Sequence, residues 1–216
     1  MRVLRLDGRW LTAVVLTLIA VTAFAEPPPK RIAIAEFGEP LFGETLTHWP
    51  YVNPKAPRGG SIVVAAFGTF DNLNQYILKG NVARSIGVTN DSLMTGSGDD
   101  LLGMYALIAK NVSYPDDISE ATFELHQEAH YDDGTAITAD DFKLAFDTIR
   151  THGRPFLRSF YREVDSVAVI DAHHVKFTFK TRNNMKPLMA VAGLSPLPSH
   201  YWKSRDITAT TLKPQP

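Results

Sequence analysis

A strand, a turn, a capped helix and a hairpin follow one another between residues 121 and 180, and this order constrains the fold more than any other feature. Phe123 and Leu125 alternate with polar neighbours, which predicts a strand, and Asp133 with Gly134 predicts a turn after it. Strands and helices do not alternate as strict βαβ units along the chain. The pattern therefore predicts a mixed α/β (α+β) fold.

The helix in this series has a recognisable beginning and end. Thr138 is followed three residues later by Asp141, and this spacing predicts a capped helix start with its acids at the positive end of the helix dipole. Gly153 and Pro155 predict its end. Four apolar residues fall at helical spacing and predict one packed face: Phe142, Ala145, Phe146 and Ile149.

Other elements are predicted from shorter patterns. Two alternating runs, 164–170 and 175–180, predict a hairpin. Residues 61–67 are apolar and β-branched between glycines, which predicts a strand buried on both faces. Apolar spacing also predicts short helices within 81–95 and 101–109.

The first 25 residues have the composition of an export signal. Three arginines precede an apolar run at 11–23, and Ala23 and Ala25 form an A-x-A cleavage site. Because the run is shorter than the roughly 20 residues that cross a bilayer, we expect a cleaved signal peptide (1–25) and no membrane insertion afterwards. Residues 26–60, rich in proline and glycine, are expected to be an extended leader before the folded part, 61–216.

Composition narrows the chemistry. The chain has no cysteine, which excludes disulfides, thiolate metal sites and cysteine nucleophiles. Loss of the signal removes three arginines and one aspartate, so the formal charge changes from −1 to −3. Because the mature chain carries no excess of positive charge, nucleic-acid binding is not predicted. The export signal predicts a location outside the inner membrane, which for a bacterium means the periplasm.

Neither catalysis nor metal binding is predicted. His126 and His130 follow a strand and turn, where their spacing does not bring them together, and His173 and His174 lie at a hairpin tip. The sequence contains no G-x-S-x-G, H-E-x-x-H or phosphate-binding lysine loop, and we expect no cofactor. A polar loop after strand 61–67 favours solute binding instead. Four aromatic residues are candidates for lining such a site or for the core: Phe67, Phe70, Tyr76 and Tyr105.

A series of short strings occurs in a fixed order at 37–40, 48–49, 51–54, 56–60, 68–74, 77–80, 123–125, 129–135, 138–141 and 197–202. Together these strings resemble the dipeptide/oligopeptide-binding proteins of ABC transporters, extracellular solute-binding protein family five, and within it the Yej-type branch. The resemblance extends over essentially the whole mature chain. Gln75 departs from it where proline is usual, and His126 where arginine or lysine is usual. The resemblance implies the amino-terminal part of a two-lobed, type II periplasmic-binding-protein-like fold without its second lobe, with 61–216 as part of the first lobe.

The resemblance also implies a function. The protein would be the substrate-binding component of an ABC importer, a monomer that captures peptides or similar small solutes and delivers them to an inner-membrane permease. It would not be an enzyme. Four first-lobe residues would contact the ligand: Thr69, Phe70, Asp71 and Asn72. Thr69 and Asn72 would bond the peptide backbone and Phe70 would pack on it, whereas for Asp71 capping of a turn is the favoured role.

Two other classes stay open on the sequence. One is an exported peptide hydrolase or transpeptidase domain, which would turn peptides over. The other is a sensory or interaction module that uses the same lobe to bind a protein partner rather than to serve transport.

Overall fold

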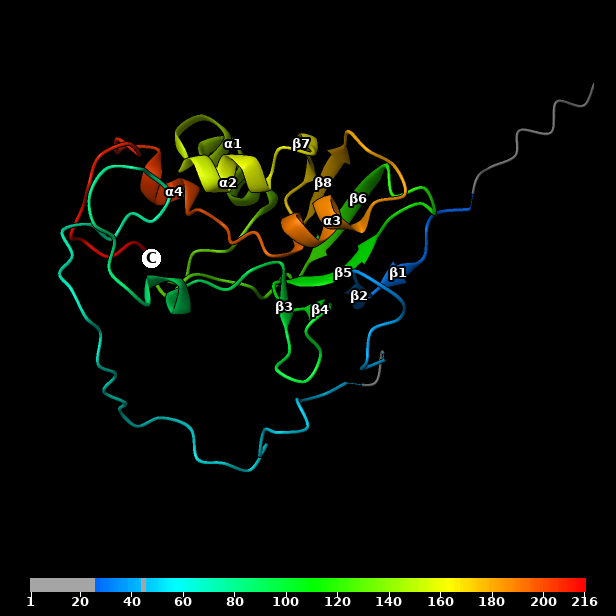
Figure 1. Ribbon diagram of the computed structural model, residues 1–216, viewed down its shortest axis with the longest axis horizontal. Coiled ribbons are helices and arrows are strands. Elements are labelled where there is room, and N and C mark those ends of the chain that lie inside the picture. Colours follow the sequence, from blue (N-terminus) through cyan, green and yellow to red (C-terminus); the bar gives the residue numbers. More distant parts are fainter. Residues whose placement is uncertain (1–25, 44–45) are drawn as a thin grey trace, which may run out of the picture.

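The computed structural model describes residues 26–43 and 46–216, and the predicted signal peptide lies outside them. Two antiparallel sheets and four α-helices form the body, which confirms the predicted mixed α/β class (Figure 1). None of the helices in the described ranges is long and apolar enough to cross a membrane.

The larger sheet has five strands in the order β1-β5-β6-β8-β7. The strands are β1 (Lys30–Arg31), β5 (Ala109–Ser113), β6 (Glu120–Leu125), β8 (His174–Phe179) and β7 (Val164–Asp171). In the register of β6 and β8, Phe123 lies opposite Val175 and Ala121 opposite Phe177, and all four side chains are buried. The predicted strand at 121–126 and the predicted hairpin are therefore confirmed.

The smaller sheet has three strands in the order β2-β4-β3. They are β2 (Ala33–Ala35), β4 (Gly103–Ala106) and β3 (Met94–Gly96). The stretch 26–60 thus supplies a strand to each sheet, because β1 joins the larger sheet and β2 the smaller one. Between Ala35 and Ile86 the described residues form no further helix or strand, which the prolines and glycines predict for the part up to residue 60.

Helix α1 (Ala139–His152) packs on the larger sheet beside α2 (Pro155–Phe160). Its predicted apolar residues are all buried, and the ring of Phe146 lies 6.1 Å from that of Phe177 on β8. The capping box of Thr138 and Asp141 and the end at Gly153 are as predicted. Gly134 takes φ +84° in the predicted turn, where its amide donates to the Tyr131 carbonyl at 3.0 Å.

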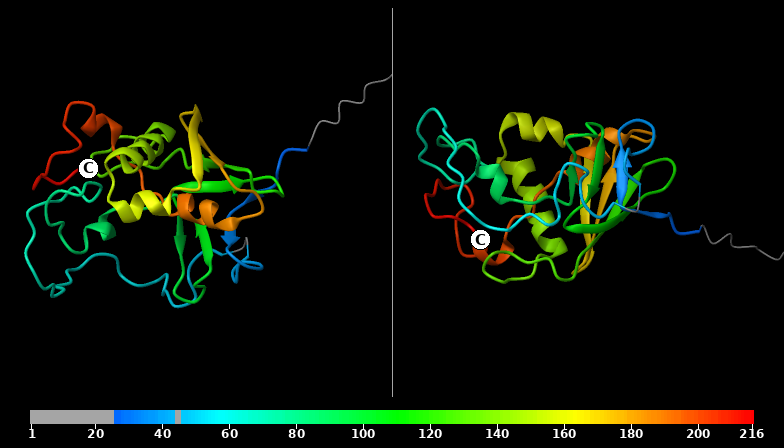
Figure 2. Two further views of the ribbon diagram at one scale, coloured as in Figure 1. Left: turned by 45° about the horizontal axis from the view of Figure 1, so that its top comes forward. Right: turned by 90° about the horizontal axis from the view of Figure 1, so that it is seen from below.

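The remaining helices follow the hairpin or precede β3. They are α3 (Met185–Ala192), α4 (Ser199–Trp202) and one 3₁₀ turn, η1 (Ile86–Thr89). The chain then runs as an irregular tail beside residues 72–74, where the Leu73 amide donates to the Thr211 carbonyl at 2.7 Å. Figure 2 shows the tail and this segment next to each other from two further directions.

The predicted buried strand at 61–67 is wrong for this structure. These residues are irregular and exposed, with Val63 96% and Ile62 86% exposed. A strand buried on both faces needs a neighbouring strand and cover on each side. Nothing in the described ranges supplies them.

The two helices predicted within 81–95 and 101–109 are also wrong. Ser85 takes φ +69°, which interrupts a helix, and only η1 forms before β3. Leu93 is fully buried and its amide donates to the Leu194 carbonyl at 3.1 Å. Residues 103–106 become the central strand of the smaller sheet. Short apolar runs fit either a helix or a strand, and here sheet pairing decides.

Candidate functional site

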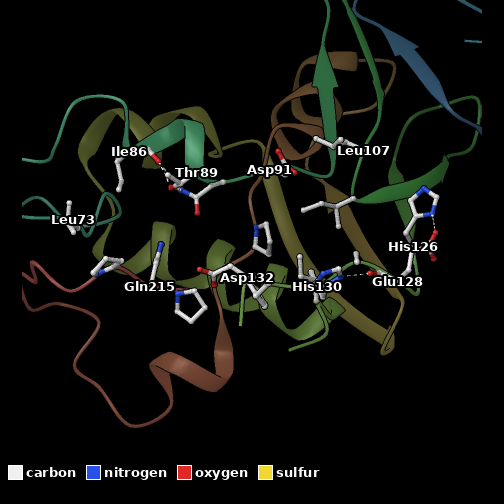
Figure 3. Close-up of a pocket in the computed structure, with 18 residues that line it drawn as sticks. Leu73, Ile86, Thr89, Asp91, Leu107, His126, Glu128, His130, Asp132 and Gln215 are labelled. Atoms are coloured by element: carbon white, nitrogen blue, oxygen red, sulfur yellow. Dashed lines mark hydrogen bonds and ion pairs between the residues drawn. The ribbon is translucent and has the colours of Figure 1, made fainter. Parts of the chain in front are cut away.

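A hollow of about 880 Å³ opens between η1, the loop that follows β6 and the end of the tail (Figure 3). Leu73, Ile86 and Leu107 contribute apolar side chains from three separate segments. Ile108 and Ile137 add buried aliphatic surface, and prolines 196, 214 and 216 complete the apolar lining. A cavity of this size accommodates a small organic ligand such as a short peptide.

The polar lining of this cavity is acidic. Asp91, Glu128 and Asp132 contribute three carboxyl groups from two segments, and the lining includes no lysine or arginine. All three residues are exposed at the mouth. A cavity with apolar walls and carboxylates at its mouth favours a ligand that has both apolar groups and a positive charge.

Glu128 organises the loop after β6. Its carboxylate pairs with His126 at 3.3 Å, and its carbonyl oxygen lies 2.8 Å from Nδ1 of His130. A bond from its own backbone amide and the neighbouring His126 lower the pKa of Glu128. Both histidines thus line the cavity as partners of Glu128. Within 26–43 and 46–216, no cluster of three or more potential ligands is arranged to hold a metal ion.

Tyr131 forms a buried part of the wall. Burial raises its pKa well above the ordinary value, and the nearby Asp141 carboxylate adds to the shift. Burial also raises the pKa of Tyr76 to about 12. Both hydroxyl groups therefore stay protonated at neutral pH.

The four residues predicted to contact ligand lie in the loop just before Leu73. Phe70 is exposed, and the Thr69 carbonyl accepts a hydrogen bond from the Asn81 side chain. The Asp71 carboxylate accepts a hydrogen bond from the backbone amide of Asn81 at 2.6 Å. The backbone amide of Asp71 in turn donates to the backbone carbonyl of Asn81 at 3.0 Å. Asp71 thus closes a loop with Asn81, ten positions later in the chain, and the turn cap and the ligand contact considered for it stay predictions.

Asn72 has no free polar group for a ligand. Its side-chain amide donates to the carbonyls of Asn74 at 2.9 Å and Lys79 at 3.0 Å. Its side-chain oxygen accepts from the amides of Asn74 at 2.9 Å and Thr211 at 3.1 Å. The residue is fully buried. Asn72 therefore fastens the tail to the loop, and the peptide contact predicted for it does not fit this geometry.

A second hollow, of about 290 Å³, lies beside an aromatic cluster. The ring of Tyr105 stands edge-on to that of Trp49 at 5.1 Å and lies 5.8 Å from that of Phe42. The Tyr105 hydroxyl donates to Asp100 at 2.5 Å, and this bond is the main cause that lowers the pKa of Asp100. Of the aromatic candidates, Tyr105 and Tyr76 are buried, whereas Phe67 and Phe70 are exposed.

Sequence reasoning missed most of the larger cavity. The sequence patterns present His126 and His130 only as candidate metal ligands. No local pattern indicates that residues 214–216 line the same cavity as Leu73, because the position of the tail depends on the bonds of Asn72 and Asn74 to it.

Comparison with known proteins identifies the family. Residues 103–216, more than half of the chain, match "Bacterial extracellular solute-binding proteins, family 5 Middle". The chain belongs to this family of solute-binding proteins. A curated relative, "Probable peptide-binding protein YejA" of Agrobacterium fabrum, is 35% identical over 211 residues, which cover 94% of this chain and 34% of the relative. The chain spans about a third of the length of the curated relatives it matches.

Solved structures show the same fold. NikZ from Campylobacter jejuni, in complex with Ni(L-His), superposes with a TM-score of 0.53 at 17% identity over 66% of this chain and 28% of NikZ. The oligopeptide-binding protein AppA of Bacillus subtilis, in complex with a nonapeptide, gives 0.51 at 16% identity over 65% of this chain and 28% of AppA. The resemblance to part of a periplasmic-binding-protein-like fold is therefore confirmed.

Proposed function

We propose that this chain is part of the substrate-binding component of an ABC importer, which captures peptides in the periplasm and passes them to an inner-membrane permease. Membership of the solute-binding family and the name of the Agrobacterium fabrum relative support this proposal. The observation that carries it for this chain is the acidic, apolar-walled cavity. Receptors of this kind act by binding alone, as a monomer.

The cavity suits one end of a peptide. A peptide amino terminus or basic side chain would lie near Asp91, Glu128 and Asp132, where three carboxylates attract a cation. The aliphatic walls would contact the first apolar side chains of the peptide. Because such contacts require no specific hydrogen bond, peptides of many sequences would be accepted. Thr69 and Phe70, at the end of the neighbouring loop, stay proposed contacts.

The proposal is tested by NMR titration of residues 26–216 with Lys-Ala-Lys and Glu-Ala-Glu. We expect the basic peptide to shift signals of residues that line the cavity, and the acidic peptide to leave them unchanged. Asp132→Asn should weaken binding of the basic peptide about 3- to 10-fold, because it removes one attractive charge in a partly hydrated site. Raising the salt concentration should weaken binding further.

Asp116→Asn is the matched control, since Asp116 is an exposed aspartate outside the cavity lining. It should leave the affinity unchanged. Shifts scattered over the surface, or equal responses to both peptides, would contradict the proposed site. Mass spectrometry of the same mixtures should find both peptides intact, whereas cleavage products would favour the hydrolase alternative.

A further inference from the structure

Aromatic and basic side chains gather on the exposed side of helix α2, which lies beside α1 (Figure 1). Phe156 is 74% and Phe160 52% exposed, and their ring centroids are 6.2 Å apart. Arg158, Arg162 and Lys180 are also exposed. Lys180 joins this group from the end of β8, because its Nζ donates to the Arg162 carbonyl at 2.6 Å. We call these five residues the α2 patch.

Other side chains hold α2 on the body of the protein. Leu157 packs against the hydrophobic core, and Tyr161 at the end of the helix is buried in it. Because residues four positions apart lie on the same side of a helix, Phe156 and Phe160 share one flank, and Arg158 lies on the opposite flank. Helix α2 therefore exposes an aromatic flank and a basic flank to solvent.

Positive charge is concentrated in this part of an acidic protein. Residues 150–162 include four arginines and no acidic residue, so they carry a formal charge of +4 and the rest of the mature chain carries −7. Glu163, whose carboxylate lies 3.2 Å from Nε of Arg162, is the only acid among the described residues that pairs with the patch. The Arg158 side chain forms no ion pair within the described ranges. An anionic surface is therefore attracted to the α2 patch.

We propose that the α2 patch docks the protein on a membrane surface that displays anionic phospholipid headgroups. Exposed phenylalanines beside basic side chains are typical of segments that lie in the membrane interface. The two rings would enter the boundary between headgroups and acyl chains. Arg158 and Arg162 would bind lipid phosphates above the rings, because the arginine fork matches phosphate oxygens and its long stem extends toward them.

Other occupants match fewer features of the α2 patch. The same patch on a second copy of the chain would be repelled, because both are basic. An acidic protein segment would pair with the arginines but would also have to supply an apolar pocket for both rings. Docking on lipid goes beyond the proposed function, because it does not depend on which ligand the cavity binds.

The test is co-sedimentation of the mature chain, residues 26–216, with lipid vesicles in the absence of peptide. Vesicles of phosphatidylglycerol and phosphatidylcholine in equal parts are compared with vesicles of phosphatidylcholine alone. We expect at least about tenfold stronger binding to the anionic vesicles, and loss of most of it when the salt concentration rises from about 0.05 to 0.5 M. Arg158→Gln should weaken binding about fivefold, because it removes one charge at the lipid surface. Replacing both Phe156 and Phe160 by serine should weaken it about tenfold at unchanged charge.

Arg58→Gln and Leu101→Ser are the matched controls, because both residues are exposed and lie outside the α2 patch. Each should change vesicle binding by less than about twofold. All the substituted side chains are exposed, so every variant should keep its melting temperature within about 2 °C.

Three results would overturn the proposal: no binding to anionic vesicles, equal binding to both kinds of vesicle, or equal losses from Arg158→Gln and Arg58→Gln. Binding of polyglutamate without binding of vesicles would also overturn it and would assign the patch to an acidic protein partner. Because the vesicle assay contains no peptide, its failure is distinguishable from a failure of the proposed ligand site.

Discussion

Asn72 is the residue whose role the structure changes most. Its buried side chain makes four hydrogen bonds, three within the loop at 69–83 and one that joins this loop to Thr211 of the tail. Asn72→Ala would leave the amides of Asn74 and Thr211 without that acceptor. We expect the free energy of unfolding of residues 26–216 to fall by about 2–4 kcal/mol, measured by urea denaturation without any ligand.

Asn53→Ala is the matched control for this substitution. Asn53 is exposed and its side chain accepts one bond, from the Lys55 amide at 3.0 Å. Its replacement should change the free energy of unfolding by less than about 0.5 kcal/mol. If both variants were equally stable, Asn72 would be free for another role, including the ligand contact predicted from the sequence.

At the scale of elements, Asp141 joins helix α1 to the first residue of α4, Ser199. One carboxylate oxygen accepts from the Thr138 amide and the other from the Ser199 amide, each at 2.8 Å. Asp141→Ala should lower the free energy of unfolding by about 2–4 kcal/mol, because two partly buried amides lose their buried acceptor. Asp140→Ala, in the same turn but exposed, should cost about 0.5 kcal/mol. Thermal and urea denaturation of both variants would show whether only Asp141 connects the two elements.

Elements whose stability depends on neighbours in sequence were predictable. Short-range sequence patterns predicted three such features correctly. They are the helix cap at Thr138, the turn at Gly134 and the hairpin of β7 and β8. Residues 61–67 and 103–106 have an equally apolar pattern but depend on distant partners. For 103–106 the partners β2 and β3 are present, so a strand forms where a helix was predicted. For 61–67 no described partner exists, so the predicted strand is absent.

The candidate site was less predictable than the fold for the same reason. Its acidic residues, Asp91, Glu128 and Asp132, have no common sequence motif and lie on segments that only tertiary packing brings together. The loop at 69–72 was predictable as a polar loop, but the direction of the Asn72 side chain depends on a tail about 140 positions later. Spacing along the chain cannot reveal such a contact.

On the scale of the whole molecule, acid should weaken the fold. Hydrogen bonds and nearby positive charges lower the pKa of seven described carboxyl groups: Asp100, Asp117, Glu124, Glu128, Asp133, Asp171 and Asp206. A carboxyl group with a lowered pKa stabilises the folded state above its unfolded pKa. This contribution is lost as the pH falls through the folded pKa. Stability should therefore be highest above about pH 5 and decrease on acidification.

Glu124 makes this dependence testable at one position. Bonds from Lys30, Asn111 and Lys110 lower its pKa from 4.5 to about 2, with Lys30 the largest cause. Glu124→Gln should lower the free energy of unfolding by about 1 kcal/mol above pH 4.5, since both lysines are well exposed to solvent. The difference from the unsubstituted protein should shrink as the pH falls below 4.5 and vanish only below about pH 2, once the folded pKa has been passed. Glu26→Gln is the matched control, because Glu26 lies in the exposed stretch before β1 and its replacement measures the general effect of removing one negative charge. Urea denaturation at several pH values measures both variants. A difference that grows on acidification would mean that the lysine contacts do not hold the Glu124 carboxylate in its charged form.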